Sequence, residues 1–124
     1  MLVRVLFFSV LVISCASRNM DDIKREMELA QKNQNTEKQI ELYEEIIDRF
    51  PESKEAVTAE FQVAFIYNNY LKNYDEAERR YKAFIKKHPN HELISSAEYE
   101  IKTLRIPADQ LLLPDSINVE GMTK

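Results

Sequence analysis

The stretch Ala59-Glu60-Phe61-Gln62-Val63 returns 38 positions later as Ala97-Glu98-Tyr99-Glu100-Ile101. Small, acidic, aromatic and aliphatic residues hold the same places in both copies. The same offset relates four more pairs: Tyr43 to Tyr81, Ile46 to Phe84, Ile47 to Ile85 and Pro51 to Pro89. The repeated unit therefore contains two helix-length segments, and a proline ends the second of them.

This period predicts the fold class. Repeats of roughly 34 to 40 residues built from helix pairs are typical of an α-solenoid, in which each unit buries its apolar face against its neighbours. One glycine among 124 residues and 44% hydrophobic residues agree with long helices in one small domain. We predict an all-α fold: a short solenoid of about five antiparallel helices, covering residues 20–106.

Apolar spacing and helix punctuation divide that domain into five helices. They are expected at Met20 to about Lys32, at Glu37 to Phe50, from Ser53 or Lys54 to Leu71, from Asp75 to Pro89 and at Glu92 to Arg105. Thr36 and Gln39 are predicted to form a capping box, and Asp75 to cap the fourth helix. The third helix is apolar nearly all round, which predicts burial on more than one side.

Composition argues against several function classes. The formal net charge of −4 gives no electrostatic reason for a nucleic acid partner. The only glycine is Gly121, so no glycine-rich phosphate loop exists. His88 and His91 flank Pro89 without a cysteine or regular spacing, and packing in the turn is the favoured interpretation over a metal site. We expect no enzyme activity, no cofactor and no metal.

The N-terminus has the pattern of a secretory signal. Arg4 is followed by apolar runs at 5–8 and 10–13, and this segment is too short to span a bilayer. The run stops at Cys15, the only cysteine in the chain, so no intramolecular disulfide is available.

The tetrapeptide Val12-Ile13-Ser14-Cys15 resembles the lipobox of bacterial lipoproteins. The resemblance implies that residues 1–14 are a removed signal peptide, that Cys15 is lipidated with acyl chains such as palmitate, and that 15–19 form a tether. Ala16 and Ser17 resemble the residues of lipoproteins sent to the outer membrane, facing the periplasm. The alternative is an ordinary signal sequence that contains a cysteine.

Residues 20–105 resemble tetratricopeptide repeat (TPR) proteins. The matching residues are small or aromatic, followed by the closing proline: Ala64, Tyr67, Tyr74, Ala77, Tyr81, Phe84 and Pro89. Ala64 stands where glycine is commoner, and Lys102 stands where the last helix should carry a small residue. Lys102 suggests that this helix is a capping helix.

A lipobox before TPR helices resembles the TPR lipoproteins of the β-barrel assembly machinery, and the repeat is also similar to that of Tol-Pal-associated periplasmic proteins. This resemblance implies a non-catalytic adaptor in the bacterial cell envelope that binds an envelope protein or peptide, in outer-membrane protein assembly or envelope maintenance. A structural, self-associating envelope lipoprotein, a homo-oligomer whose groove is filled by its own copies or tail, is the alternative.

The TPR resemblance also assigns a peptide-binding groove on the third helix. Its lining residues would be Thr58, Phe61, Phe65, Asn68 and Asn69. The two rings would supply buried area and the amides would bind a peptide backbone. In the alternative, Phe61 and Phe65 pack against the first helix.

Two further features leave their interpretation open. The second helix is mainly acidic and the fourth mainly basic. The favoured interpretation is a solvated face that complements the helix dipole; in the alternative, the two helices attract each other and the basic patch meets an acidic partner or lipid headgroups. The tail at 107–124 contains Leu111-Leu112-Leu113 before Pro114. It either folds back on the capping helix or binds a partner, because two and a half repeats fall below the three usually needed for stability.

Overall fold

The computed structural model describes residues 18–111 of the chain. The predicted signal peptide, Cys15 and residues 112–124 lie outside this part. The helices are α1 (Met20–Lys32), α2 (Thr36–Arg49), α3 (Lys54–Asn69), α4 (Tyr74–Lys87), α5 (Ile94–Thr103) and the short α6 (Ala108–Leu111). The described residues contain no strand.

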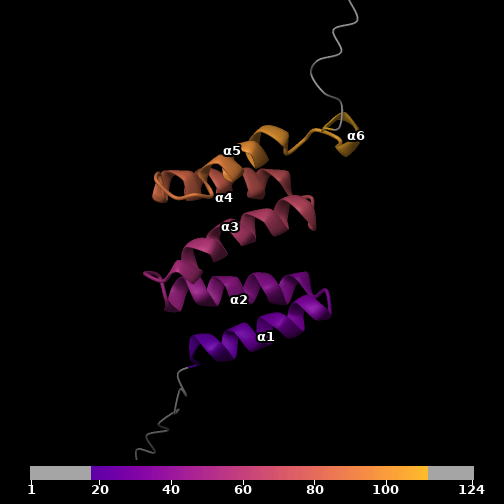
Figure 1. Ribbon diagram of the computed structural model, residues 1–124. Helices are drawn as coiled ribbons and strands as arrows, with labels where there is room; N and C mark the ends of the chain where they lie inside the picture. The colour runs from indigo at the N-terminus through magenta and orange to yellow at the C-terminus, as the bar shows by residue number, and fades with distance from the viewer. Residues whose placement is uncertain (1–17, 112–124) are drawn as a thin grey trace, which may run out of the picture.

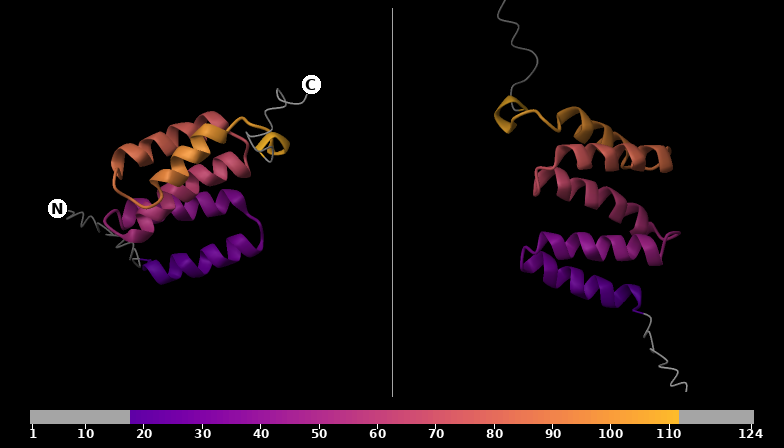
Figure 2. Two further views of the ribbon diagram at one scale, coloured as in Figure 1. Left: turned by 45° about the horizontal axis from the view of Figure 1, so that its top comes forward. Right: turned by 180° about the vertical axis from the view of Figure 1, so that it is seen from behind.

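The five longer helices form one stack. Figure 1 shows them running alternately in opposite directions from α1 to α5, and both views in Figure 2 keep this order. The helices that pack most closely are neighbours along the chain: α1 with α2, α2 with α3, α3 with α4 and α4 with α5. The predicted all-α, TPR-like solenoid of about five antiparallel helices is confirmed.

The core consists of two apolar clusters that meet at α3. One joins α1 and α2 to the start of α3, where Ala56 and Ala59 belong to it. The other joins the rest of α3 to α4 and α5, with Phe61 and Ala64 among its members. The predicted burial of the third helix on more than one side is therefore confirmed, and α3 holds the two clusters together.

Small side chains stand where the helices approach each other most closely. Five alanines are no more than 1% exposed: Ala56, Ala59, Ala64, Ala77 and Ala97. Large side chains fill the space beside them, and Tyr81 and Phe84 are almost completely buried. Burial of a side chain of this size stabilises the fold by about 1.5–3 kcal/mol, so the alanines set the helix spacing and the rings fill it.

The helix caps differ from the prediction. Asn35, not Thr36, caps α2 by accepting a hydrogen bond from the Lys38 amide at 3.0 Å. Asn73, not Asp75, caps α4 in the same way. Each asparagine follows a residue with positive φ, Gln34 at 53° and Lys72 at 54°. This sharp reversal brings the asparagine to the cap position, and because the two turns are 38 positions apart they are copies of one turn.

Several helix ends also differ, most clearly in α3 and α5, while α1 has the predicted bounds. α3 ends at Asn69 rather than Leu71, and α5 covers 94–103 rather than 92–105. Asn19 forms a capping box with Asp22 at the start of α1. Arg18 forms ion pairs with Glu26 and, at 2.8 Å, with Glu45. Residues 18–19 therefore belong to the folded domain rather than to the tether predicted at 15–19.

An ion pair made by Arg80 joins α2 and α4, as in the alternative interpretation of their opposite charges. Its guanidinium lies 2.7 Å from Glu44 of α2 and 2.7 Å from Glu76 of its own helix. It also lies over the Tyr67 ring, 5.1 Å from the centroid. Arg80 therefore ties α2, α3 and α4 together on the side of the stack formed by the even-numbered helices.

Glu76 carries the clearest pH dependence among the described residues. Hydrogen bonds from Arg79 and then Arg80 lower the pKa of its carboxyl group from 4.5 to about 2, although partial burial opposes them. Because the pKa in the folded state is depressed, the stabilisation is complete above pH 4.5 and is lost as the pH falls toward 2.

We therefore predict that Glu76→Gln lowers the free energy of unfolding by about 1 kcal/mol at pH 7, a value reduced for solvent screening. The difference from the parent protein should vanish near pH 2. Urea unfolding between pH 7 and pH 2 measures it, with Glu37→Gln in the first turn of α2 as the control. A constant difference across this range would contradict the assignment to Glu76.

Candidate functional site

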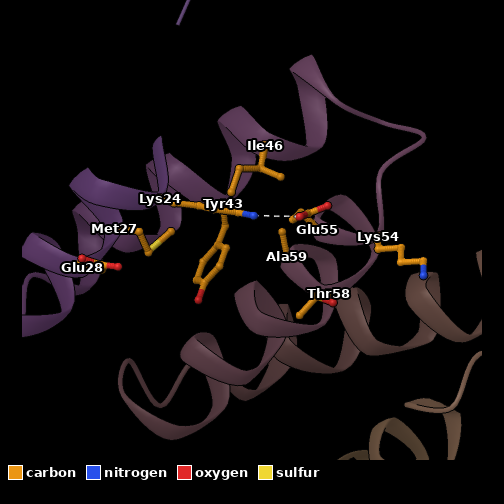
Figure 3. Close-up of a pocket in the computed structure, with 9 residues that line it drawn as sticks. All are labelled: Lys24, Met27, Glu28, Tyr43, Ile46, Lys54, Glu55, Thr58 and Ala59. Carbon is orange, nitrogen blue, oxygen red and sulfur yellow. Dashed lines mark hydrogen bonds and ion pairs between the residues drawn. The ribbon is translucent and has the colours of Figure 1, made fainter. Parts of the chain in front are cut away.

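A hollow opens between α1 and α3, with Tyr43 of α2 in its middle (Figure 3). Its volume is about 470 Å³. Its lining is mainly apolar in the interior and charged at the mouth: Lys24, Met27, Glu28, Tyr43, Ile46, Lys54, Glu55, Thr58 and Ala59. Met27, Ile46 and Ala59 are buried. The hollow can therefore take an apolar group of side-chain size.

An ion pair connects the two walls of this hollow. Lys24 Nζ of α1 lies 2.8 Å from Glu55 Oε1 of α3, and Figure 3 shows the pair beside the Tyr43 ring. The hydrogen bond raises the pKa of Lys24 and lowers the pKa of Glu55. Both groups are solvent-exposed, so the pair contributes little to stability. It remains free to exchange partners when a ligand brings its own charge.

A second hollow of about 540 Å³ shares one lining residue, Tyr43, with the first. Its lining combines amides with aromatic rings: Gln31, Gln34, Thr36, Gln39, Tyr43, Gln62, Phe65, Ile66 and Tyr70. Burial raises the pKa of Tyr43, and a hydrogen bond with Gln31 acts in the opposite direction. The phenol is therefore neutral at physiological pH and keeps both donor and acceptor capacity.

The two hollows form one strip, called the α1–α3 groove below. Positions 24, 28 and 31 of α1 face positions 58, 62 and 65 of α3 across it. Spacings of three and four residues place each set along one face of its helix. α1 and α3 therefore form the two sides of the groove, and residues of α2, among them Tyr43, line it between them.

The structure divides the five residues predicted for the groove. Thr58 lines the first hollow and Phe65 the second. Asn69 is exposed at the end of α3, where its side chain donates to the Phe65 carbonyl at 3.1 Å. Phe61 and Asn68 face α4 and α5 instead, because they lie on a different side of α3 from 58, 62 and 65.

Phe61 and Asn68 are occupied by contacts in the core. Phe61 is 8% exposed, and its ring lies 5.4 Å from that of Tyr81 and 5.8 Å from that of Phe84, edge to face. The Asn68 amide donates to Glu100 of α5 at 2.7 Å. The prediction that they line the groove is thus corrected, and Phe61 packs on α4 rather than on the first helix.

Sequence reasoning missed Tyr43, Met27 and Gln62, although the repeat contains the signal that finds them. With the offset of 38, Ile23 corresponds to Phe61 and Ile46 to Phe84. Two rings that enclose Tyr81 in the second unit are therefore isoleucines around Tyr43 in the first. Tyr81 is completely buried and Tyr43 is not. Of the two isoleucines, Ile46 lines the hollow beside Tyr43, where the second unit has the larger Phe84.

The two histidines pack in the turn after α4. The His88 ring lies 5.1 Å from the Phe84 ring, and the His91 ring 5.8 Å from it. His88 Nε2 lies 2.7 Å from a carboxylate oxygen of Glu60. Residues 18–111 contain no group of three or more histidine, cysteine or acidic side chains placed to hold a metal ion. Within the same residues, no helix has the length and apolar character needed to cross a membrane.

Comparison with known families decides the nature of the repeated unit. Residues 58–91, which contain most of α3, all of α4 and the turn after it, match the tetratricopeptide repeat family model. These residues are therefore similar to one TPR unit. No curated protein and no solved structure matches the chain. TPR units are typically scaffolds for protein–protein interaction rather than enzymes, so the repeat supports a general adaptor role.

The two phenylalanines of the predicted groove should respond differently to truncation. Phe61→Ala removes a ring from the core and should lower the free energy of unfolding by about 3–5 kcal/mol. Phe65→Ala removes a half-buried ring from the groove and should cost about 1 kcal/mol. Urea unfolding monitored by circular dichroism measures both. An equal loss for the two variants would contradict their placement on different faces of α3.

Proposed function

We propose that this protein is a non-catalytic adaptor that holds a peptide segment of a partner protein in the α1–α3 groove. The observation that carries the proposal is the division of the groove into an apolar hollow and an amide-rich hollow joined at Tyr43. A peptide has the same two parts, namely apolar side chains and a polar backbone.

The apolar hollow suits one anchoring side chain of the peptide. A large aliphatic or aromatic group would contact Met27, Ile46 and the Tyr43 ring, and would displace water from their surfaces. Lys24 and Glu55 at the mouth would accept charged groups on either side of the anchor. This arrangement favours a peptide whose apolar residue is flanked by charged residues.

The amide-rich hollow suits the peptide backbone. Each glutamine offers both a donor and an acceptor, as each peptide unit does, and four glutamines line this hollow: Gln31, Gln34, Gln39 and Gln62. Phe65 and Tyr70, with ring centroids 6.4 Å apart, would cover one side of the bound chain. Backbone recognition of this kind accepts many sequences, so the anchor would supply most of the specificity.

We further propose that the adaptor works at the bacterial cell envelope. The lipobox-like residues 12–15 support removal of the signal peptide and lipidation of Cys15. Several acyl chains would hold the domain at a membrane without a membrane-spanning helix. Ala16 and Ser17 support the outer membrane, with the domain facing the periplasm. An envelope protein would be the partner, in outer-membrane protein assembly or envelope maintenance.

A structural, self-associating lipoprotein is the second candidate function. It is favoured by large apolar side chains that are exposed on the described part of the chain: Leu29, Tyr70, Leu71, Tyr99, Ile106 and Leu111. Side chains of this type gather in interfaces between copies of a protein.

Filling the groove tests the adaptor function. Thr58 is exposed at the mouth, so Thr58→Arg should block the apolar hollow without disturbing the core. We expect crosslinked partner recovered from membranes to fall at least tenfold, with unchanged helicity by circular dichroism. Ser96→Arg, on the exposed side of α5, is the matched control and should capture partner normally.

Two outcomes of that experiment would count against the adaptor. Undiminished capture by Thr58→Arg would contradict binding in the groove. Conversion of an oligomer to a monomer by the same change, measured by sedimentation without any loss of partner, would favour the self-associating lipoprotein.

The envelope assignment has a separate test. Cys15→Ser removes the only thiol, and the protein should move from the membrane fraction to the soluble fraction. Ser17→Ala leaves the cysteine in place and should not change fractionation. If the Cys15→Ser protein remains with the membranes after a carbonate wash, lipidation at this residue is not the anchor.

A further inference from the structure

α5 exposes a face that its counterpart α3 buries. Tyr99 is 58% exposed and Lys102 is exposed as well. The residues 38 positions earlier, Phe61 and Ala64, are covered by α4 and belong to the second core cluster. α5 therefore corresponds to α3, the first helix of a repeat. Residues 18–111 contain no helix after α5 that corresponds to α4.

The repeat register identifies where that second element lies in the sequence. With the offset of 38, α6 at 108–111 takes the place of the turn at 70–73 between α3 and α4. The residues that follow, 112–124, take the place of 74–86 in α4. Residue 112 therefore corresponds to the first residue of α4, the helix that covers α3 in the complete unit.

We propose that residues 112–124 pack on the exposed face of α5 as the second segment of the last repeat, with Asp115 against Lys102 and with Val119 and Met122 against Tyr99. This inference does not depend on the α1–α3 groove, which lies on other helices.

The first support for this packing is a pair of residues with opposite charges, Lys102 and Asp115. In the complete unit Ala64 and Ala77 are both fully buried in one cluster. Their counterparts are Lys102 and Asp115. A lysine alone at this place would prevent close packing, and so would an aspartate alone. Opposite charges at the two places would allow an ion pair where the complete unit has two small, buried side chains.

The second support is the apolar pattern around Tyr99. Phe61 contacts the rings of Tyr81 and Phe84 in the complete unit. The corresponding partners of Tyr99 are Val119 and Met122, and both are apolar. A methionine beside an aromatic ring is a favourable contact that tolerates irregular geometry. The face that the segment would cover and the residues that would cover it are therefore complementary in both charge and polarity.

Chain length and intrinsic propensity fit a segment that gains its order from α5. Thirteen residues reach about 40 Å when extended, whereas the ten residues of α5 are about 15 Å long. Pro114 followed by Asp115 suits a helix start. Ile117, Val119 and Gly121 weaken a helix, so the segment depends on contacts with α5 rather than on its own propensity.

A charge exchange in the full chain tests the ion pair. Lys102→Asp and Asp115→Lys should each speed amide hydrogen exchange in α5 about fivefold, and the two changes together should restore it. The control combines Asp115→Lys with Lys32→Asp on α1, which should restore nothing. Single variants that leave exchange in α5 unchanged, or a double variant without recovery, would overturn the proposal.

Introduced thiols test the apolar contact and identify the occupant. In a Cys15→Ser background, Tyr99→Cys with Val119→Cys should form a disulfide within one chain under mild oxidation. Ile117 corresponds to the exposed Arg79, so Tyr99→Cys with Ile117→Cys is the matched control and should react at least tenfold more slowly. A disulfide between chains would assign the face to a second copy and overturn packing within the chain, as would equal reaction of both pairs.

Discussion

The close approach of helices at buried alanines is the constraint on which the rest of the structure depends. Ala64 and Ala77 let α3 and α4 approach closely, and Ala56 and Ala59 do the same at the start of α3. Because these contacts fix the helix spacing, the ring volume available beside each crossing is fixed as well. The size of the side chains beside each crossing then determines whether the space in that unit is filled or leaves a hollow.

The two helix pairs of this chain differ in how completely their space is filled: α3 and α4 bury their central tyrosine, whereas α1 and α2 do not. Tyr81 is enclosed by Phe61 and Phe84 in the complete TPR unit, with ring distances of 5.4 and 5.8 Å. Tyr43, its counterpart, has only Ile23 and Ile46 in the equivalent places, so it contributes to the walls of the α1–α3 groove. Smaller side chains around Tyr43 than around Tyr81 thus accompany the change from a buried ring to a ring that lines a groove.

Much of the fold could be predicted from the sequence, because it depends on local patterns. The repeat offset, the bounds of α1 and the two-sided burial of α3 all follow from residue spacing. The caps could not be assigned correctly, because Asn35 and Asn73 reach the cap positions only through the positive φ of Gln34 and Lys72. A backbone conformation adopted by a glutamine or a lysine leaves little trace in the sequence.

The groove was predictable only in part. Thr58 and Phe65 line the α1–α3 groove, whereas Phe61 and Asn68 face the core, since each residue turns a helix by about 100°. Tyr43 was missed because its partial exposure becomes apparent only when its neighbours are compared with those of Tyr81 in the other unit. Matching the two units residue by residue, rather than assigning one helix face, recovers that information.

A photo-crosslinking amino acid at position 62 tests most directly whether the α1–α3 groove is the binding site. Gln62 lies in the groove, whereas Arg25 is exposed on α1 outside the set of residues that line it. Illumination of cells that produce the protein should attach a partner polypeptide at position 62 and not at position 25. Equal yields at the two positions, or attachment at position 25 alone, would contradict binding in the groove.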